Sequence, residues 1–167
     1  MSVVVVLAAH GAPPTDYPPK RVGMLMALEF TGNIVERVGF LRAWRDRLDH
    51  EIRHWQRTDS NDPYKNGVES LAAQIAEQVG CPVIVGYNEF CNPTIAEAID
   101  RAVTQGATRV VVATTMFTRG GDHSEREIRE LVESAQVRHP GIAIVYAWPY
   151  DQERVAQLYA DQLNRFF

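Results

Sequence analysis

The run of seven uncharged residues from Val3 to Ala9 limits the possible folds of this chain more than any other feature. It contains no polar residue, a pattern typical of a strand that is buried on both faces in a parallel sheet covered by helices. Gly11 and the prolines that follow end the run, so His10 is predicted to lie at the carboxyl end of the strand. Ligands of open α/β sheets bind at this edge. His10 is therefore a candidate site residue, and the alternative is an ordinary loop histidine.

A second apolar run, residues 109–117, repeats this arrangement. It breaks at a loop that contains Gly120 and Gly121 and leads through His123 into a predicted helix. Two parallel strands that each end in a histidine-bearing loop can bring both imidazoles to one edge of a sheet. The repetition favours a site over two unrelated loop histidines.

Two carboxylates lie near the same predicted edge. Glu89 follows a third apolar run, residues 82–87, and Glu125 lies two residues beyond His123. For each of them the alternative is a surface carboxylate near a helix start, where the helix dipole favours negative charge. Two imidazoles with one or two carboxylates suit a divalent first-row cation such as Fe²⁺, Co²⁺ or Ni²⁺.

The rest of the chain alternates strands with helices. The predicted strands are residues 3–9, 82–87, 109–117 and 142–147, and the predicted helices are residues 22–30, 33–56, 68–79, 93–105, 122–138 and 152–166. Strands that alternate with helices of about ten or more residues indicate right-handed crossovers and a parallel sheet. We therefore predict one α/β domain over residues 1–167, a three-layer sandwich with a four-stranded parallel sheet. Residues 13–67 are long for one crossover and are expected to be a helical insertion that covers or shapes the site.

Composition argues against several classes of protein. A length of 167 residues is enough to bury a core without disulfides or a structural metal. The net charge of -4 argues against a general nucleic-acid binder. Cys81 and Cys91 have no zinc or disulfide spacing and suit a reducing compartment. No apolar run approaches the roughly 20 residues that span a bilayer, and no basic segment precedes the first strand. We expect a cytoplasmic protein that binds neither nucleic acid nor membranes.

Residues 50–54 read His-Glu-Ile-Arg-His and match the zincin pattern HExxH. In that pattern two histidines one helical turn apart bind Zn²⁺ and the glutamate acts as a base. The surroundings disfavour zinc, because charged residues flank the segment, Arg53 would repel a dication and no obvious third ligand follows. The alternative is that His50 and His54 belong to a solvated helix face.

Three segments, in this order and spacing, resemble the class II tetrapyrrole chelatases. This group contains the CbiX and SirB sirohydrochlorin chelatases and, more distantly, ferrochelatase. Residues 8–13 (AAHGAP) are similar to its opening histidine motif, residues 87–95 (YNEFCNPTI) to its strand, glutamate and proline segment, and residues 115–123 to the loop with its second histidine. Residues 122–125 (DHSE) also resemble the Asp-His-x-Glu of ferrochelatase. The resemblance covers most of residues 3–150 but not residues 13–67, where the chain departs from the short chelatases.

The resemblance implies a lyase that inserts Co²⁺, Fe²⁺ or Ni²⁺ into sirohydrochlorin or a related tetrapyrrole in cobalamin or siroheme biosynthesis. The cation is then a substrate, and no organic cofactor is expected. His10 would be the base and a metal ligand, and His123 would complete the metal site or take a second proton. Glu89 or Glu125 would help to hold the cation and relay protons.

The resemblance also implies how the macrocycle is bound and how the chain assembles. Sirohydrochlorin carries many carboxylates, so cations are expected near the rim of the site, and small residues would let a flat group approach the backbone. The candidates are Gly11, Lys20, Arg21, Arg119, Gly120, Gly121 and Arg126. Family members of this length pair as homodimers. The alternatives are a porphyrin enzyme similar to ferrochelatase and a non-catalytic tetrapyrrole or metal carrier.

Overall fold

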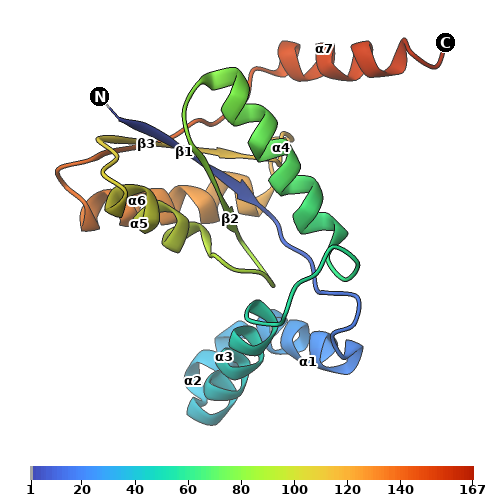
Figure 1. Ribbon diagram of the computed structural model, residues 1–167. Helices are drawn as coiled ribbons and strands as arrows, with labels where there is room; N and C mark the ends of the chain where they lie inside the picture. The colour runs from blue at the N-terminus through green and yellow to red at the C-terminus, as the bar shows by residue number, and fades with distance from the viewer. Residues whose placement is uncertain (1) are drawn as a thin grey trace.

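The computed structural model describes residues 2–167 and contains one parallel four-stranded sheet with the order β2-β1-β3-β4 (Figure 1). The strands are β1 Val3–Ala9, β2 Val83–Tyr87, β3 Arg109–Thr114 and β4 Ala143–Tyr146. In the register, Val5 of β1 lies opposite Val83 of β2 on one side and Val111 of β3 on the other. The predicted α/β architecture with a four-stranded parallel sheet is confirmed.

Helices cover both faces of this sheet. They are α1 Pro19–Phe30, α2 Gly32–Arg37, α3 Gly39–Arg53, α4 Pro63–Val79, α5 Ile95–Thr104, a π-helical turn His123–Glu127 that continues into α6 Ile128–Arg138, and α7 Gln152–Leu163. On one face, α5 and α6 bury side chains of β1 and β3 that include Val6 and Val112. On the other face, α4 packs its Val68 and Ala72 against Leu7 of β1 and Tyr87 of β2. Side chains along β1 point alternately to the two faces of the sheet, so the strand contributes to two cores, one under each layer of helices.

The long segment between β1 and β2 forms a group of helices beside the sandwich. Figure 1 shows α1, α2 and α3 gathered near the end of β2, with α4 alone returning to the sheet. These helices share a separate core, which is joined by Phe90 from the loop after β2. The buried members of this core are Tyr17, Leu25, Leu28, Val35, Leu48, Ile52 and Phe90.

Two predictions about this segment were wrong in detail. The predicted helix 33–56 is two helices, because Val38 has an extended backbone (φ -112°, ψ 100°) and the chain restarts at Gly39. The predicted helix 68–79 begins earlier, since α4 starts at Pro63. The Asp62 carboxylate accepts the N–H of Lys65 and caps this helix, and proline is suited to the first helical position.

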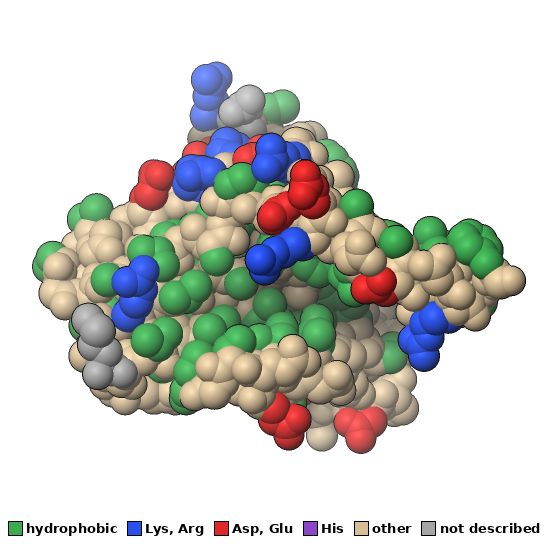
Figure 2. All heavy atoms as spheres, turned by 90° about the horizontal axis from the view of Figure 1, so that it is seen from above, with side chains coloured by type: hydrophobic (Ala, Val, Ile, Leu, Met, Phe, Trp, Pro, Cys, Tyr) green, Lys and Arg blue, Asp and Glu red, His purple; other side chains and the backbone are tan. Residues whose placement is uncertain are grey.

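The C-terminal helix α7 projects from the body of the molecule (Figure 1). None of its residues is buried, and its apolar side chains and those of the last two residues are exposed: Leu158, Tyr159, Leu163, Phe166 and Phe167. Seen from above, hydrophobic side chains also gather in a hollow across the middle of the molecule (Figure 2). In the sheet, the row Val5, Val111 and Val145 is only half-buried. Among the described residues, no helix has both the length and the apolar character needed to cross a bilayer.

Candidate functional site

Three side chains meet at the carboxyl edge of the sheet. His10 comes directly after β1, Glu89 follows β2, and His123 lies in the segment after β3. The Nε2 atoms of His10 and His123 lie 3.8 Å from Glu89 Oε2 and Oε1 respectively. The two imidazoles are perpendicular, with their centroids 5.1 Å apart. Within residues 2–167, these three form the one group of potential metal ligands whose atoms all lie within 4.8 Å of one another.

The strand order explains this convergence. The chain leaves the central strand β1 toward β2 on one side and later toward β3 on the other, so the loops after these three strands are neighbours. Crevices of this kind, at the point where the strand order reverses, are the usual ligand sites of open α/β sheets. The structure therefore brings together the three predicted ligands from distant parts of the sequence.

Gly11 allows the loops after β1 and β2 to touch. Its φ is +98°, in the region that favours glycine, and an added Cβ would lie 1.9 Å from the carbonyl oxygen of Glu89. The N–H of Glu89 donates to the carbonyl of His10 at 2.8 Å. The hydroxyl of Tyr64, on α4, accepts the N–H of His10 at 3.3 Å. The backbones that carry His10 and Glu89 are thus fixed against each other.

The partners of both imidazoles define their tautomers. His10 Nδ1 lies 3.0 Å from the carbonyl oxygen of Gly11, and His123 Nδ1 lies 2.6 Å from Glu127 Oε2. Because a carbonyl and a carboxylate only accept hydrogen bonds, each Nδ1 carries the proton. In the neutral rings, both Nε2 lone pairs are then free on the side of Glu89. Histidines that bind metals are commonly oriented in this way by a second partner.

Glu127 and Asn88 are functional candidates that the sequence reasoning missed. Asn88 Nδ2 donates to Glu127 Oε2 at 3.0 Å and lies 2.9 Å from His123 Nδ1, so both groups share the Glu127 carboxylate. His123 and Glu127 lie on the π-helical turn, a feature often found at functional sites. The four-residue spacing of a histidine and a glutamate at a helix start was the available signal.

This carboxylate changes the titration of His123. The hydrogen bond to Glu127 raises the pKa of His123, against the opposing effect of partial burial, and the charges of Glu127 and Glu89 add to the increase. For Glu127, burial acts to raise the pKa. The hydrogen bonds from Asn88 and His123 outweigh it, so the pKa of Glu127 is lowered. In the metal-free protein, Glu127 thus stabilises the protonated form of His123 relative to that of a free imidazole.

Replacing Glu127 by glutamine is expected to lower the pKa of His123, because the substitution removes the negative charge and the charge-assisted hydrogen bond. NMR titration of the His123 ring in the metal-free protein measures this shift. The raised pKa of His123 stabilises the fold below the imidazole's unfolded pKa, and this contribution is lost as the pH rises through the folded value. The lowered pKa of Glu127 stabilises the fold above the carboxyl's unfolded pKa, and this contribution is lost as the pH falls through the folded value.

The stability difference between wild type and Glu127→Gln should therefore be largest between the two folded pKa values. We expect about 1 kcal/mol there for this partly exposed pair, decreasing at higher and at lower pH. Denaturant titrations at several pH values measure it. A difference that does not vary with pH would contradict this electrostatic account of the pair.

The structure does not bring Glu125 to the other three candidates. Trp148 Nε1 donates to Glu125 Oε2 at 3.1 Å, and the N–H of Gly120 donates to Oε1 at 3.2 Å. These bonds, that of Trp148 foremost, lower the pKa of Glu125. The side chain therefore braces the loop that leads to His123 and does not join the ligand group.

The predicted substrate-binding residues differ in their surroundings. Arg21, on α1, pairs with Glu51 of α3. Arg119, Gly120 and Gly121 are exposed in the loop before His123. A hollow of about 370 Å³ adjoins this loop, and its lining includes Met116, Phe117, Gly121, His123 and Tyr159 of α7.

The HExxH segment lies on and just after α3, and its two histidines do not join the ligand group. The rings of His50 and His54 stack with their centroids 4.0 Å apart, and Asn92 Nδ2 lies 2.9 Å from His54 Nε2. Glu51 pairs with Arg21. No third ligand joins the two histidines in the part of the chain that the structure describes. The arrangement favours the alternative of an ordinary helix face.

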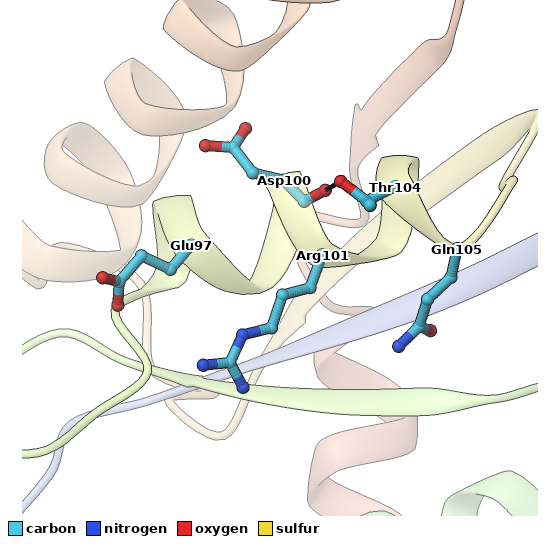
Figure 3. A pocket seen from close by; sticks show the side chains of 5 residues that line it. All are labelled: Glu97, Asp100, Arg101, Thr104 and Gln105. Atoms are coloured by element: carbon cyan, nitrogen blue, oxygen red, sulfur yellow. Dashed lines mark hydrogen bonds between the residues drawn. The ribbon is translucent and has the colours of Figure 1, made fainter.

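A further hollow, of about 360 Å³, lies on α5 (Figure 3). The side chains that line it, Glu97, Asp100, Arg101, Thr104 and Gln105, come from α5 and its C-terminal cap. Glu97 belongs to the capping box of α5, and Asp100 pairs with His139 and Arg138. Because these polar groups have partners elsewhere and do not converge, this hollow is a poor candidate for chemistry.

Comparisons with known proteins identify a family and a fold. The family model CbiX matches residues 59–165, which include Glu89 and His123. The sirohydrochlorin cobaltochelatase of Methanocaldococcus jannaschii is 34% identical over 79 residues, 46% of this chain and 54% of that protein. The sirohydrochlorin ferrochelatase of Priestia megaterium is 25% identical over 81 residues, 48% of this chain and 30% of that protein. The matched regions thus span about half or less of these relatives.

Solved structures extend the likeness in fold to nearly the whole chain. A putative cobalamin biosynthesis CbiX protein from Marinobacter aquaeolei VT8 has a TM-score of 0.53 at 16% identity, and 98% of each chain is covered. SirB from Bacillus subtilis, solved with Fe³⁺, has a TM-score of 0.51 at 16% identity and covers 96% of this chain and 46% of that one. At this identity the likeness concerns the fold, and it includes the part of the chain that carries His10.

Proposed function

We propose that this chain, which belongs to the CbiX family, inserts a divalent cation into sirohydrochlorin or a related tetrapyrrole. The observation that carries the proposal is the meeting of two imidazole Nε2 atoms and the Glu89 carboxylate at one sheet edge. Two ligand atoms that bind one metal at about 2.1 Å in tetrahedral geometry lie about 3.4 Å apart. The observed 3.8 Å between each Nε2 and Glu89 is close to this separation. Two histidines and one carboxylate leave coordination positions open for a second substrate.

The donor set also suits the proton chemistry of metal insertion. Pyrrole N–H groups are very weak acids, and two protons must leave as the cation binds. The cation lowers their pKa as a Lewis acid, and a neutral imidazole is a suitable base near neutral pH. We assign the base role to His10, whose Nε2 lone pair faces the site and whose side chain is 42% exposed. His123, held by Glu127, completes the metal site or takes the second proton.

The macrocycle would lie against the hollow beside His123. Met116, Phe117 and Tyr159 supply an apolar wall there, and the exposed glycines 120 and 121 allow a flat ring to approach the backbone. Arg119 on the same loop is exposed and can pair with a substrate carboxylate. We propose Co²⁺, Fe²⁺ or Ni²⁺ as the cation, since the donor set suits all three.

An anaerobic absorbance assay tests this function. Sirohydrochlorin is mixed with each cation in the presence and absence of the protein, and metallation is followed by the change in the macrocycle's spectrum. Faster metallation with the protein supports the chelatase and identifies the preferred cation. A rate equal to the control, with a spectral shift on mixing, would favour a tetrapyrrole carrier. If the protein neither speeds metallation nor shifts the spectrum of the macrocycle, sirohydrochlorin is excluded as the substrate. The assay is then repeated with porphyrins.

We also propose that the protein is a cytoplasmic homodimer. The exposed apolar face of α7 and the half-buried valine row of the sheet are two surfaces of one chain that a second copy can cover. Sedimentation velocity measures the mass in solution. A monomer at micromolar concentration would contradict the proposal.

A further inference from the structure

The loop that carries Glu89 is held by donors from outside the sheet. Arg53, the last residue of α3, donates from Nη2 to the carbonyl of Asn88 at 2.9 Å and from Nη1 to the carbonyl of Cys91 at 3.0 Å. Arg57 donates from Nη2 to the carbonyl of Phe90. The two guanidinium groups therefore bind the backbone on both sides of Glu89.

Arg57 also binds the loop that carries His10. Its Nη1 donates to the carbonyl of Ala12 at 2.9 Å, and its Nη2 donates to the carbonyl of Ile52 at 3.0 Å. Ala12 lies two residues beyond His10. One planar group with fixed donor directions thus joins the His10 loop, the Glu89 loop and the end of α3, a task for which a lysine ammonium is poorly suited.

Acidic partners balance both arginines. Arg53 Nε lies 2.8 and 2.9 Å from the carboxylate oxygens of Asp49, and Arg57 Nη1 lies 2.5 Å from Asp62 Oδ2. The arginine side chains are only 14% and 11% exposed, and that of Asp62 is 2% exposed. Because each guanidinium is paired with a carboxylate, the arginines hold the loop without leaving an uncompensated positive charge beside a cation site.

The conformation of Phe90 shows that the loop needs such support. Its φ is +57°, in the left-handed region that is unfavourable for a residue other than glycine. Conformations of this kind persist only where the surroundings impose them. The Phe90 side chain is buried in the core of α1–α3 with Leu25 and Ile52, and its carbonyl accepts from Arg57.

We infer that Arg53 and Arg57 are positioning residues that set the Glu89 carboxylate for metal binding. Their placement gives the insertion of residues 13–67 a direct part in the metal site. This inference rests on the proposed function, because it concerns the same ligand group. Its structural part, the holding of residues 88–91 by the two arginines, can be measured separately.

Arg53→Lys is expected to weaken the binding of Co²⁺ to the folded protein by about 10-fold, the lower end of the effect of losing a partner that orients a ligand. Lysine keeps the charge beside Asp49 but cannot serve two carbonyls with a rigid fork. Titration with Co²⁺, followed by its visible absorption bands, measures affinity and ligand geometry together. In the insertion assay, KM for the cation should rise while KM for sirohydrochlorin stays unchanged.

Arg45→Lys is the matched control. Arg45 lies on the same helix, and its guanidinium binds Glu36 and Asp46, away from the Glu89 loop. This variant should bind Co²⁺ as the wild type does. Thermal unfolding of both variants identifies any loss of the fold. If Arg53→Lys does not fold, Asp49→Asn removes the anchor of Arg53 at a more exposed position and should also weaken Co²⁺ binding.

Hydrogen exchange of the segment 88–92 tests the contacts themselves. We expect faster exchange in Arg53→Lys than in Arg45→Lys. Wild-type Co²⁺ affinity and absorption bands in Arg53→Lys would overturn the inference, as would exchange no faster than in the control. If the wild type binds no Co²⁺, the proposed metal site fails, and the exchange result decides on the arginine contacts alone.

Discussion

Replacing His10 by alanine is expected to lower the rate of metal insertion by about 100-fold or more, the usual contribution of a positioned general base. The substitution removes one of the two Nε2 atoms that face Glu89 and can bind a metal. In our proposal it also removes the group that accepts a pyrrole proton. The side chain is 42% exposed, so its removal should change the free energy of unfolding by less than about 1 kcal/mol. The anaerobic absorbance assay gives the rate, and denaturant titration gives the stability.

His50→Ala is the control for this experiment. His50 is exposed on α3 and belongs to the HExxH segment, so its loss should leave the rate of insertion unchanged. The opposite result, with a rate lost in His50→Ala and kept in His10→Ala, would move the chemistry to the HExxH segment. An unchanged rate in both variants would leave the ligand group without a role in catalysis.

Replacing Gly11 by alanine is expected to destabilise the protein by about 3 kcal/mol or more, combining backbone strain with overpacking. The added Cβ would lie 1.9 Å from the carbonyl oxygen of Glu89, and the backbone at φ +98° disfavours any side chain. The contact is with backbone, so no side chain can rotate to relieve it. The loops of His10 and Glu89 must then separate. We therefore expect the affinity for Co²⁺ to fall together with the stability of the fold.

Gly23→Ala is the matched substitution. Gly23 lies inside α1, and an added Cβ there would meet no atom within 4 Å. Alanine should therefore stabilise the protein by up to about 1 kcal/mol through its higher helix propensity. Urea denaturation of both variants measures the two effects. If Gly11→Ala is as stable as the wild type, the close approach of the two loops does not exist in solution.

The ligand group at the sheet edge could be predicted because each of its strands is visible as an apolar run in the sequence. Because the apolar run of β1 contains no polar residue, it predicts a strand that is buried on both faces. The observed strand, Val3–Ala9, has the predicted bounds. Parallel strands deliver their carboxyl ends to one edge, so the meeting of His10, Glu89 and His123 followed from topology alone. The break at Val38 was harder to see, because the apolar spacing continues through it.

The partner of His123 was missed, although its spacing along the helix was an available signal. The resemblance to Asp-His-x-Glu directed attention to Glu125, whereas the carboxylate beside His123 is Glu127. Glu127 lies four residues after His123, the spacing at which side chains on one helix face meet, whereas Glu125 lies two residues after it and points to another side. The contacts of Arg53 and Arg57 could not be predicted, for a different reason. Their bonds to the loop of residues 88–91 join parts of the chain that become neighbours only in the folded protein.

The origin of the three ligands from three separate strand ends has a consequence for folding thermodynamics. An unfolded chain holds these residues far apart, so it offers no comparable site, and a cation that binds the folded form shifts the folding equilibrium by mass action. At a free concentration 100 times the dissociation constant this amounts to about 2.7 kcal/mol. Saturating cation would then lower the unfolded fraction by about 100-fold, which would slow losses that begin from unfolded chains.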